Sequence, residues 1–317
     1  APIRGMLWAR SGWFAFHLGR SQGKMRLRKG LEMARAQKNT ADMTFALQYL
    51  SAIHSHNDQL AEAREMARQA LAQAERLGDP YYLGVINNIL ADIGFRQSHF
   101  DESEAHSQRS LALIQASDGN LWSKTFSLTN LGRVAKAQLK YDEAASFFRQ
   151  SLAVREEIGD IRGIALCYQY LGETAVENKQ SQAARKYLYM AQSLLQQIGS
   201  LREASGTFLL LADLAYREGE KKDAAHYYGR VLTLAHEFDQ TLYLRQALTG
   251  FTYVWRESHP DLVEDIDQYL QQLQPVQINL GMFGDDDDIF SSRLIPSAEL
   301  KPLDLLVTKI LTYLEVD

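Results

Sequence analysis

The sequence predicts an all-α fold, a right-handed α-solenoid in which helical hairpins follow one another along the chain. Three observations lead to this prediction. The chain repeats itself about every 40 residues, small residues recur at one place in each repeat, and only Pro2 and Pro80 precede residue 255. Because proline interrupts helices, its scarcity leaves room for long helices. Repeating units of this length indicate a stacked array rather than one compact core.

Two stretches define the repeat most clearly. The segment from Asn130 to Asp160 contains Leu131-Gly132-Arg133 near its start, and the segment from Tyr170 to Ser200 matches it 40 residues later. Extending this frame in both directions gives six repeats with steps of 40, 40, 41, 40 and 40 residues. The equivalent small residues are Ser11, Ser51, Ala91, Gly132, Gly172 and Ala212.

Each repeat is predicted to hold two helices. In the fourth we expect a first helix over residues 127–139, a tight turn at 140–142 and a second helix over 143–158, closed by Gly159. Small residues are expected where the two backbones meet, in the pairs Ser51 and Ala63, Gly132 and Ala144, Gly172 and Ala184, and Ala212 and Ala224. Bulky side chains are expected beside them, namely Phe147, Phe148, Tyr187, Leu188, Tyr227 and Tyr228.

The two ends of the chain depart from this pattern. The first helix is apolar on nearly every side, whereas terminal repeats normally have a polar outer face, so we expect a further segment upstream. A self-capping helix or a dimer contact is the alternative. Towards the other end we expect the array to span residues 1–274, with a degenerate seventh pair at 243–257 and 262–273. An irregular acidic linker over 275–302 and a C-terminal helix over 303–317 are expected to follow.

Charge and composition exclude several classes of protein. Residues 275–317 hold eight acidic and three basic side chains, which alone gives the formal net charge of −5, while 31 acidic and 31 basic residues balance in 1–274. Phosphate backbones are bound mainly by clustered Lys and Arg, so we expect no direct nucleic-acid binding. The single Cys167 rules out an internal disulfide. With no apolar run long enough to span a membrane, we expect a soluble cytoplasmic protein.

Several residues invite a catalytic or metal-binding interpretation that their spacing does not support. His54 and His56 point to different sides of a helix, so they cannot share an ion. The run Asp285–Asp288 lacks the alternating ligands of a calcium loop, and a solvated acidic loop is favoured over attraction to a basic partner. The chain contains no phosphate-binding loop, nucleophile elbow or metal-binding helix motif. We therefore expect a protein with no enzymatic activity, metal or cofactor.

The repeat resembles the tetratricopeptide repeat family. Gly132 after Leu131, the aromatic Tyr141 before Asp142-Glu143-Ala144, and Phe148 follow the pattern of that family, although the period exceeds its usual value of about 34. Longer repeats that end in Gly-Asp, as in Ser151–Asp160, are similar to the sensor segments of bacterial signal-transducing NTPase regulators of the MalT-like and AfsR-like kind. Similar units also occur in eukaryotic adaptor proteins.

This resemblance implies a binding surface. In tetratricopeptide arrays the first helix of each pair lines the concave face, and residues spaced three or four apart share one side of a helix. The residues predicted to line that face are Gln48, Tyr49, Asn88, Asp92, Arg96, Thr129, Asn130, Arg133, Lys136, Gln169, Tyr170, Glu173, Glu177, Asp213, Tyr216 and Arg217. Such a lining suits an extended peptide, a protein segment or a polar small ligand. The alternative is that these residues are merely solvated helix faces.

The expected function is therefore recognition without catalysis. The leading hypothesis is the sensor part of a larger bacterial transcription regulator, in which a bound partner or small-molecule inducer shifts the population of an attached switch. A stand-alone adaptor for a protein partner is the second hypothesis. An enzyme within residues 275–317 is the third, and no residue pattern favours it.

Overall fold

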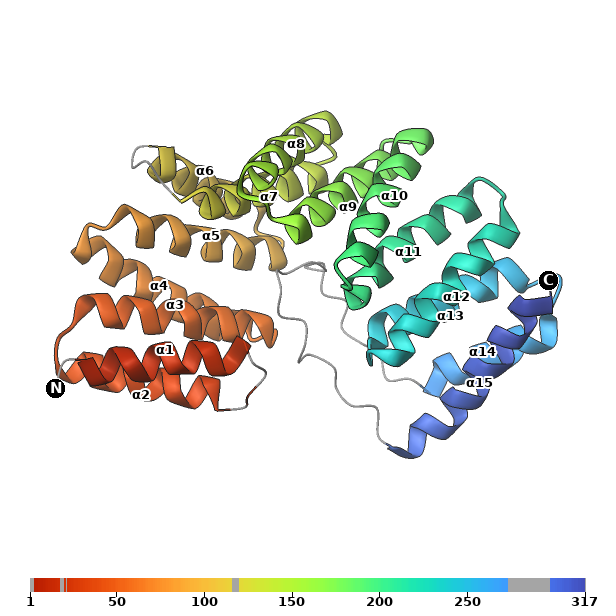
Figure 1. The fold of residues 1–317 in the computed structure, drawn as a ribbon, viewed down its shortest axis with the longest axis horizontal. Helices are drawn as coiled ribbons and strands as arrows, with labels where there is room; N and C mark the ends of the chain where they lie inside the picture. The colour runs from red at the N-terminus through yellow and green to blue at the C-terminus, as the bar shows by residue number, and fades with distance from the viewer. Residues whose placement is uncertain (1–2, 18–19, 21, 116–119, 273–296, 317) are drawn as a thin grey trace. The chain divides into compact units, whose positions relative to one another are not determined.

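The computed structural model describes residues 3–17, 20, 22–115, 120–272 and 297–316. The fold class predicted from the period is confirmed, since every regular element among these residues is an α-helix and successive helices pair as hairpins. The chain divides into two compact units, which we call unit 1 (helices of residues 1–158) and unit 2 (helices of residues 159–317). Figure 1 shows the helices of each unit in chain order.

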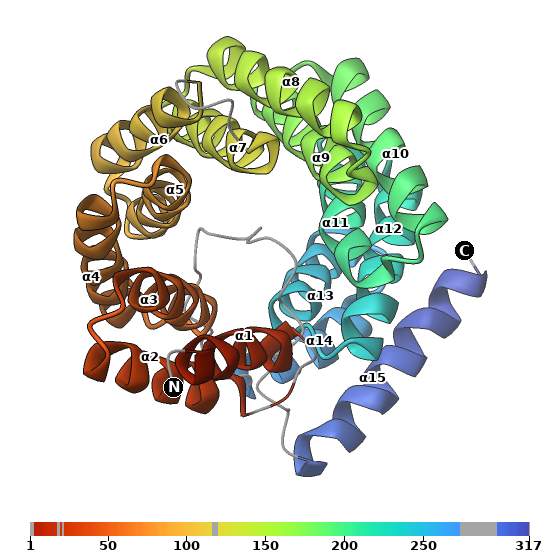
Figure 2. The ribbon, with the colours of Figure 1, turned by 60° about the vertical axis from the view of Figure 1, so that its left-hand side comes forward.

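Unit 1 contains four hairpins. Each pairs an odd-numbered helix with the even-numbered helix that follows it. Their bounds are α1 Ile3–His17, α2 Gly23–Ala36, α3 Thr40–His56, α4 Leu60–Leu77, α5 Pro80–Arg96, α6 Phe100–Gln115, α7 Leu121–Ala137 and α8 Tyr141–Ile158. Successive odd-numbered helices also contact one another. Figure 2 shows that α3, α5 and α7 line the inner side of this unit, with α4, α6 and α8 outside them.

Unit 2 continues the same pattern with three hairpins and one further helix. Their bounds are α9 Ile161–Glu177, α10 Ser181–Gln197, α11 Leu201–Arg217, α12 Lys221–Glu237, α13 Thr241–Trp255, α14 Pro260–Gln272 and α15 Ser297–Val316. The last helix packs against α12 and α14. Asp304 lies 2.7 Å from His236 Nε2, and the Tyr313 ring contacts His259. The proposed linker falls largely in residues 273–296, which lie outside the described residues, as does Asp285–Asp288.

The small and bulky residues predicted at the helix contacts occupy the expected places. Ala63, Ala144, Ala184 and Ala224 are buried at 0% exposure. Of each predicted bulky pair, the second member (Phe148, Leu188 or Tyr228) is buried and the first is half-buried. Ser51 does more than leave space, because its hydroxyl donates to the Ala63 carbonyl at 2.7 Å. The pairing of helices therefore follows from the residues that define the repeat.

The predicted ends of the first helix in the fourth repeat were wrong at both sides. α7 begins at Leu121, where the Asn120 side chain caps it by accepting from the Trp122 N–H at 3.0 Å. It ends at Ala137 instead of Leu139, because Leu139 has a positive φ of 62° and so leaves the right-handed helix. Equivalent turn residues Asp58, Ser98 and Lys179 also have positive φ. The positive φ angles therefore recur along the chain with the same period as the sequence repeat.

No helix among the described residues has the length and apolar character needed to cross a membrane. The first helix exposes Leu7 and Phe14, as its apolar sequence predicts.

Candidate functional site

The residues predicted to line the concave face lie on the odd-numbered helices α3, α5 and α7 of unit 1 and α9 and α11 of unit 2. The structure separates them into two groups. One group is buried and bonds the helices to one another, and the other keeps enough exposed surface to meet a ligand. No measurement tests the predicted set as a whole, so it stays a prediction.

Asn88 and Asn130 belong to the buried group. The Asn88 amide donates to the Ser123 carbonyl at 2.9 Å and accepts from the Ser127 hydroxyl at 2.8 Å. Asn130 donates to the Asn88 carbonyl at 3.4 Å. Because buried amides need partners, these bonds hold α7 against α5. These two amides were predicted to bind a peptide, but they form hydrogen bonds between neighbouring repeats instead.

Arg133 is also part of the frame of unit 1. It is 5% exposed, its guanidinium donates to Asp92 at 2.8 Å, and its Cζ atom lies 4.1 Å from the centre of the Phe95 ring. Arg96, on the helix before, donates to the Ser55 carbonyl at 2.6 Å. Each arginine therefore ties its helix to the preceding repeat. Asp92, Arg96 and Lys136 remain partly exposed.

Aromatic rings gather on the inner helices of unit 1, and sequence reasoning found only one of them. The Tyr49 ring of α3 lies 3.8 Å from Trp13 of α1 and 4.6 Å from Phe45. Tyr81 and Tyr82 of α5 contact each other at 5.4 Å. We call these five residues the aromatic cluster. None of them is buried, and Tyr81 is 48% exposed.

The tyrosines of the aromatic cluster influence one another electrostatically. Burial, and then the neighbouring Tyr81 and Tyr82, raise the pKa of Tyr49 to about 12, against a lowering effect of Arg10. Burial likewise raises the pKa of Tyr82. The hydroxyls of Tyr49 and Tyr82 therefore stay protonated at neutral pH and can donate hydrogen bonds. A signal for the cluster existed in the sequence, because aromatic residues recur on the first helices of the first three repeats.

Gln48 is a predicted site residue whose buried amide is not fully hydrogen-bonded. It is 5% exposed and its Oε1 atom has no hydrogen-bond partner. In the next repeat the equivalent Asn88 meets Ser127, but the residue at the corresponding place opposite Gln48 is Ile86. Since Ile86 carries no hydroxyl, the Gln48 oxygen is left without a donor.

In unit 2 the predicted residues are again divided. Gln169 accepts from the Thr207 hydroxyl at 3.2 Å, which repeats the contact of Asn88 with Ser127. Tyr170 is buried at 3% exposure. Asp213 accepts from the Tyr228 hydroxyl at 2.6 Å, and burial raises the pKa of this carboxyl. Glu173 is half-buried, whereas Glu177, Tyr216 and Arg217 are exposed.

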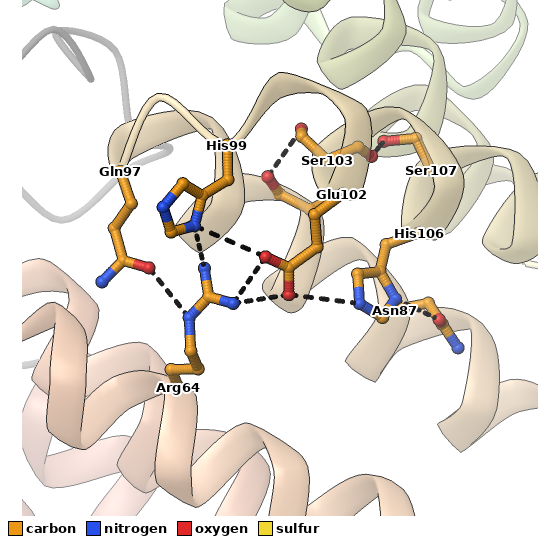
Figure 3. A network of polar contacts seen from close by, with 9 residues as sticks. Arg64, Asn87, Gln97, His99, Glu102, Ser103, His106 and Ser107 are labelled. Atoms are coloured by element: carbon orange, nitrogen blue, oxygen red, sulfur yellow. Dashed lines mark hydrogen bonds and ion pairs between the residues drawn. The ribbon is translucent and has the colours of Figure 1, made fainter.

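A polar network outside the predicted set joins α4 to the next hairpin. Figure 3 shows Arg64 reaching from α4 to Gln97, His99 and Glu102, with Nη1 2.6 Å from the carboxylate. Hydrogen bonding to Arg64 lowers the pKa of Glu102, and burial lowers the pKa of His106. Among the described residues no group of His, Cys, Asp and Glu could hold a metal ion.

The same contact recurs in other repeats, so the network of Figure 3 is a structural one. Arg185 occupies the position of Arg64 in unit 2, and it bonds Glu218 and Glu220 of the next hairpin. Lys24 occupies that position in the first hairpin and donates to Gln59 at 3.4 Å. A basic side chain at one place in the repeat thus fastens one hairpin to the following turn.

Comparison with known proteins agrees with this architecture. Residues 85–157, from α5 to α8, match the family model described as Tetratricopeptide repeat. We call these residues, which are similar to tetratricopeptide repeats, the tetratricopeptide segment. The tetratricopeptide segment contains Asn88, Arg133 and Phe148, and therefore the inter-repeat bonds and the helix contacts described above. The search of curated protein sequences found no match.

Solved structures resemble the chain over a longer range than the tetratricopeptide segment. A Rap protein complexed with Competence and Sporulation Factor is 13% identical, with a TM-score of 0.63, covering 91% of this chain and 80% of that one. The apo form of RapI is 15% identical, with a TM-score of 0.62 and coverage of 72% and 83%. BtubC from P. vanneervenii is 17% identical, with a TM-score of 0.54 and coverage of 72% and 95%. At these identities the likeness shows the fold alone.

Proposed function

We propose that this protein is a non-catalytic binding module that recognises an extended peptide or protein segment on the inner helices of unit 1. The aromatic cluster is the observation that carries the proposal. Trp13, Phe45, Tyr49, Tyr81 and Tyr82 come from three successive odd-numbered helices, contact one another in two groups, and keep exposed surface. Partly exposed aromatic residues held in place by their neighbours are typical anchors of binding sites.

The surroundings of the cluster support a peptide over an apolar small molecule. Arg10 lies over the Phe45 ring, with its Cζ atom 5.8 Å from the ring centre. Asp92, Arg96 and Lys136 keep part of their surface exposed on the neighbouring inner helices. A ligand with both apolar side chains and polar backbone groups would match this mixture. The bonds of Asn88, Asn130 and Arg133 would keep the helices that carry the ligand in place.

Two biological settings fit such a module. The first is the sensor part of a larger bacterial regulator, which the resemblance of the long repeats to MalT-like and AfsR-like proteins favours. The fold similarity to a Rap protein complexed with Competence and Sporulation Factor supports a role in signalling. The second is a stand-alone adaptor for a protein partner. A phosphate-binding loop encoded upstream of this chain would favour the regulator over the stand-alone adaptor.

The test is selection of linear peptides on the intact protein, followed by calorimetry with the synthesised peptides. Changing Tyr81→Ala removes a ring that is 48% exposed, so the fold should survive while affinity falls about tenfold or more. The control is Tyr253→Ala in unit 2, where the ring is 51% exposed and lies outside the cluster. Equal affinity of the two variants, or failure to select any peptide, would refute the proposal.

A further inference from the structure

Helix α2 carries a concentration of positive charge that the overall balance of the chain hides. Residues 1–38 contain nine basic side chains and one acidic one, Glu32, an excess of eight positive charges. The remaining residues contain 25 basic and 38 acidic side chains, an excess of thirteen negative charges. The even count over 1–274, on which the expectation of no nucleic-acid binding was based, averages this difference away. Five of the nine basic residues, Lys24, Arg26, Arg28, Lys29 and Arg35, lie within α2.

Three basic side chains of α2 are exposed to solvent, and most of its apolar residues are buried. Arg28, Lys29 and Arg35 are exposed, and Lys24 and Arg26 are half-buried. On the opposite side, Gly23, Leu27, Gly30, Leu31 and Ala34 are buried. Figures 1 and 2 show the helix at the edge of unit 1, beside α1 and α3. Lys24, Arg28 and Arg35 share one side of the helix over a rise of eleven residues, so this row of charges extends for roughly 16 Å, and Arg26 and Lys29 lie on the other flank of the exposed surface.

These cations lack a matching set of carboxylates. Within the part of the chain that the structure describes, no carboxylate lies within ion-pair distance of the five basic residues of α2. Arg26 and Arg35 bond only the neutral Gln22 and Gln69. Burial and then Arg28 lower the pKa of Lys24, and burial, Lys24 and Arg28 lower the pKa of His54. Glu62 of α4 acts in the opposite direction on both groups without reversing either shift.

We propose that the exposed face of α2 docks the phosphate backbone of a nucleic acid. A row of Lys and Arg along one helix is the electrostatic footprint of such binding. Three of the five residues are arginines, whose planar guanidinium matches two oxygens of one phosphate. Because the groups are charged and flexible, the binding would be strong at low salt and independent of base sequence.

Other polyanionic partners fit the surface less well. A helix that lies in a bilayer surface inserts an apolar face, but the apolar residues of α2 are buried in the protein and Met25 is the one large apolar side chain it exposes. A protein interface is usually built around an apolar core of several side chains, and the single exposed Met25 does not supply one. Acidic peptides and lipid vesicles therefore serve as alternative outcomes of the test.

This inference does not depend on the peptide site. The aromatic cluster lies on α1, α3 and α5, whereas the basic face belongs to α2. A protein with both surfaces would bring a peptide or protein partner to a nucleic acid. Loss of either binding activity would leave the other measurable.

The experiment measures fluorescence anisotropy of a labelled oligothymidylate of about 20 nucleotides, and of a duplex of similar length, between about 50 and 200 mM salt. The protein is the intact chain. In the variant, Arg28→Glu and Arg35→Glu reverse two charges of α2. In the matched control, Arg149→Glu and Lys186→Glu reverse two exposed charges elsewhere and change the net charge equally.

The proposal expects the α2 variant to bind at least about tenfold more weakly, and the slope of log affinity against log salt to fall by about 1.4 for the single strand. The control variant should bind as the unchanged protein does. Equal losses in both variants would mean that net charge alone acts, and would overturn the proposal. So would binding of polyglutamate or phosphatidylserine vesicles without binding of either oligonucleotide, or no binding at all.

Discussion

The hairpins of unit 1 bring their helices together in two different ways. In α3/α4 and α5/α6 the contact positions hold only small residues, and a hydroxyl crosses between the helices. Ser51 donates to the Ala63 carbonyl, and Ser103 donates to the Ala91 carbonyl, both at 2.7 Å. In α7/α8 the small pair is Gly132 and Ala144, and the Phe148 ring, one turn further along α8 where α4 has Ala67, fills the space that the glycine leaves.

The comparison teaches that the residue type at one position of the repeat depends on the size of the side chain that packs against it. Where both partners are small, the backbones approach closely enough for a side-chain hydroxyl to reach a carbonyl. Where a phenylalanine follows one turn after the small pair, the first helix has to lose even its Cβ atom, because a Cβ on Gly132 would lie 2.5 Å from Phe148 Cε1. Interiors are close-packed, so the two solutions cannot be mixed freely.

The largest expected effect is at Gly132. Gly132→Ala would force the fully buried Phe148 ring to move and should lower the free energy of unfolding by about 2 kcal/mol, even after the gain in helix propensity. The control is Gly84→Ala, where a Cβ would meet nothing nearer than 3.5 Å, and a gain of about 0.5 kcal/mol is expected. Urea denaturation measures both. Changes of the same sign and size would show that the glycine is not required by the ring.

A smaller effect is expected where a hydroxyl crosses the hairpin. Ser103→Ala removes the buried donor to the Ala91 carbonyl and should cost about 1 kcal/mol in the same measurement. Ser51→Ala should cost a similar amount in its own hairpin, because the two hydrogen bonds have the same length and burial. If both substitutions were neutral, small volume alone would explain these positions.

The smallest expected effect distinguishes Gln48 from Asn88, which occupies the equivalent position in the next repeat. Gln48→Met removes a buried oxygen with no partner and should raise the free energy of unfolding by about 1 kcal/mol or less. Asn88→Leu at the equivalent position should instead destabilise, since it removes the two hydrogen bonds that Asn88 makes with the Ser123 carbonyl and the Ser127 hydroxyl. A loss of stability in Gln48→Met would mean that this amide is satisfied in solution by a bound water.

The sequence predicted most of the fold because each repeat needs its small and bulky residues at fixed places. It did not predict the end of α7, since nothing about Leu139 as a residue type marks a left-handed turn. The candidate site was harder. The spacing that places Asn88 and Arg133 on one side of their helices does not tell whether that side meets the next repeat or solvent. The positive charge of α2 could have been found in the sequence by counting charges over about one hairpin at a time. A count over the whole array conceals it.

The turn between the two helices of a hairpin has a further consequence. Asp58, Ser98, Leu139 and Lys179 all adopt the left-handed backbone that glycine tolerates best, and Gly219 takes the same place in the next hairpin. For residues with a Cβ atom this conformation costs on the order of 1 kcal/mol. Leu139 is 69% exposed, so its side chain gains little in return. Glycine at these turn positions would therefore make the hairpins more stable, without any change to the interior or to either proposed surface.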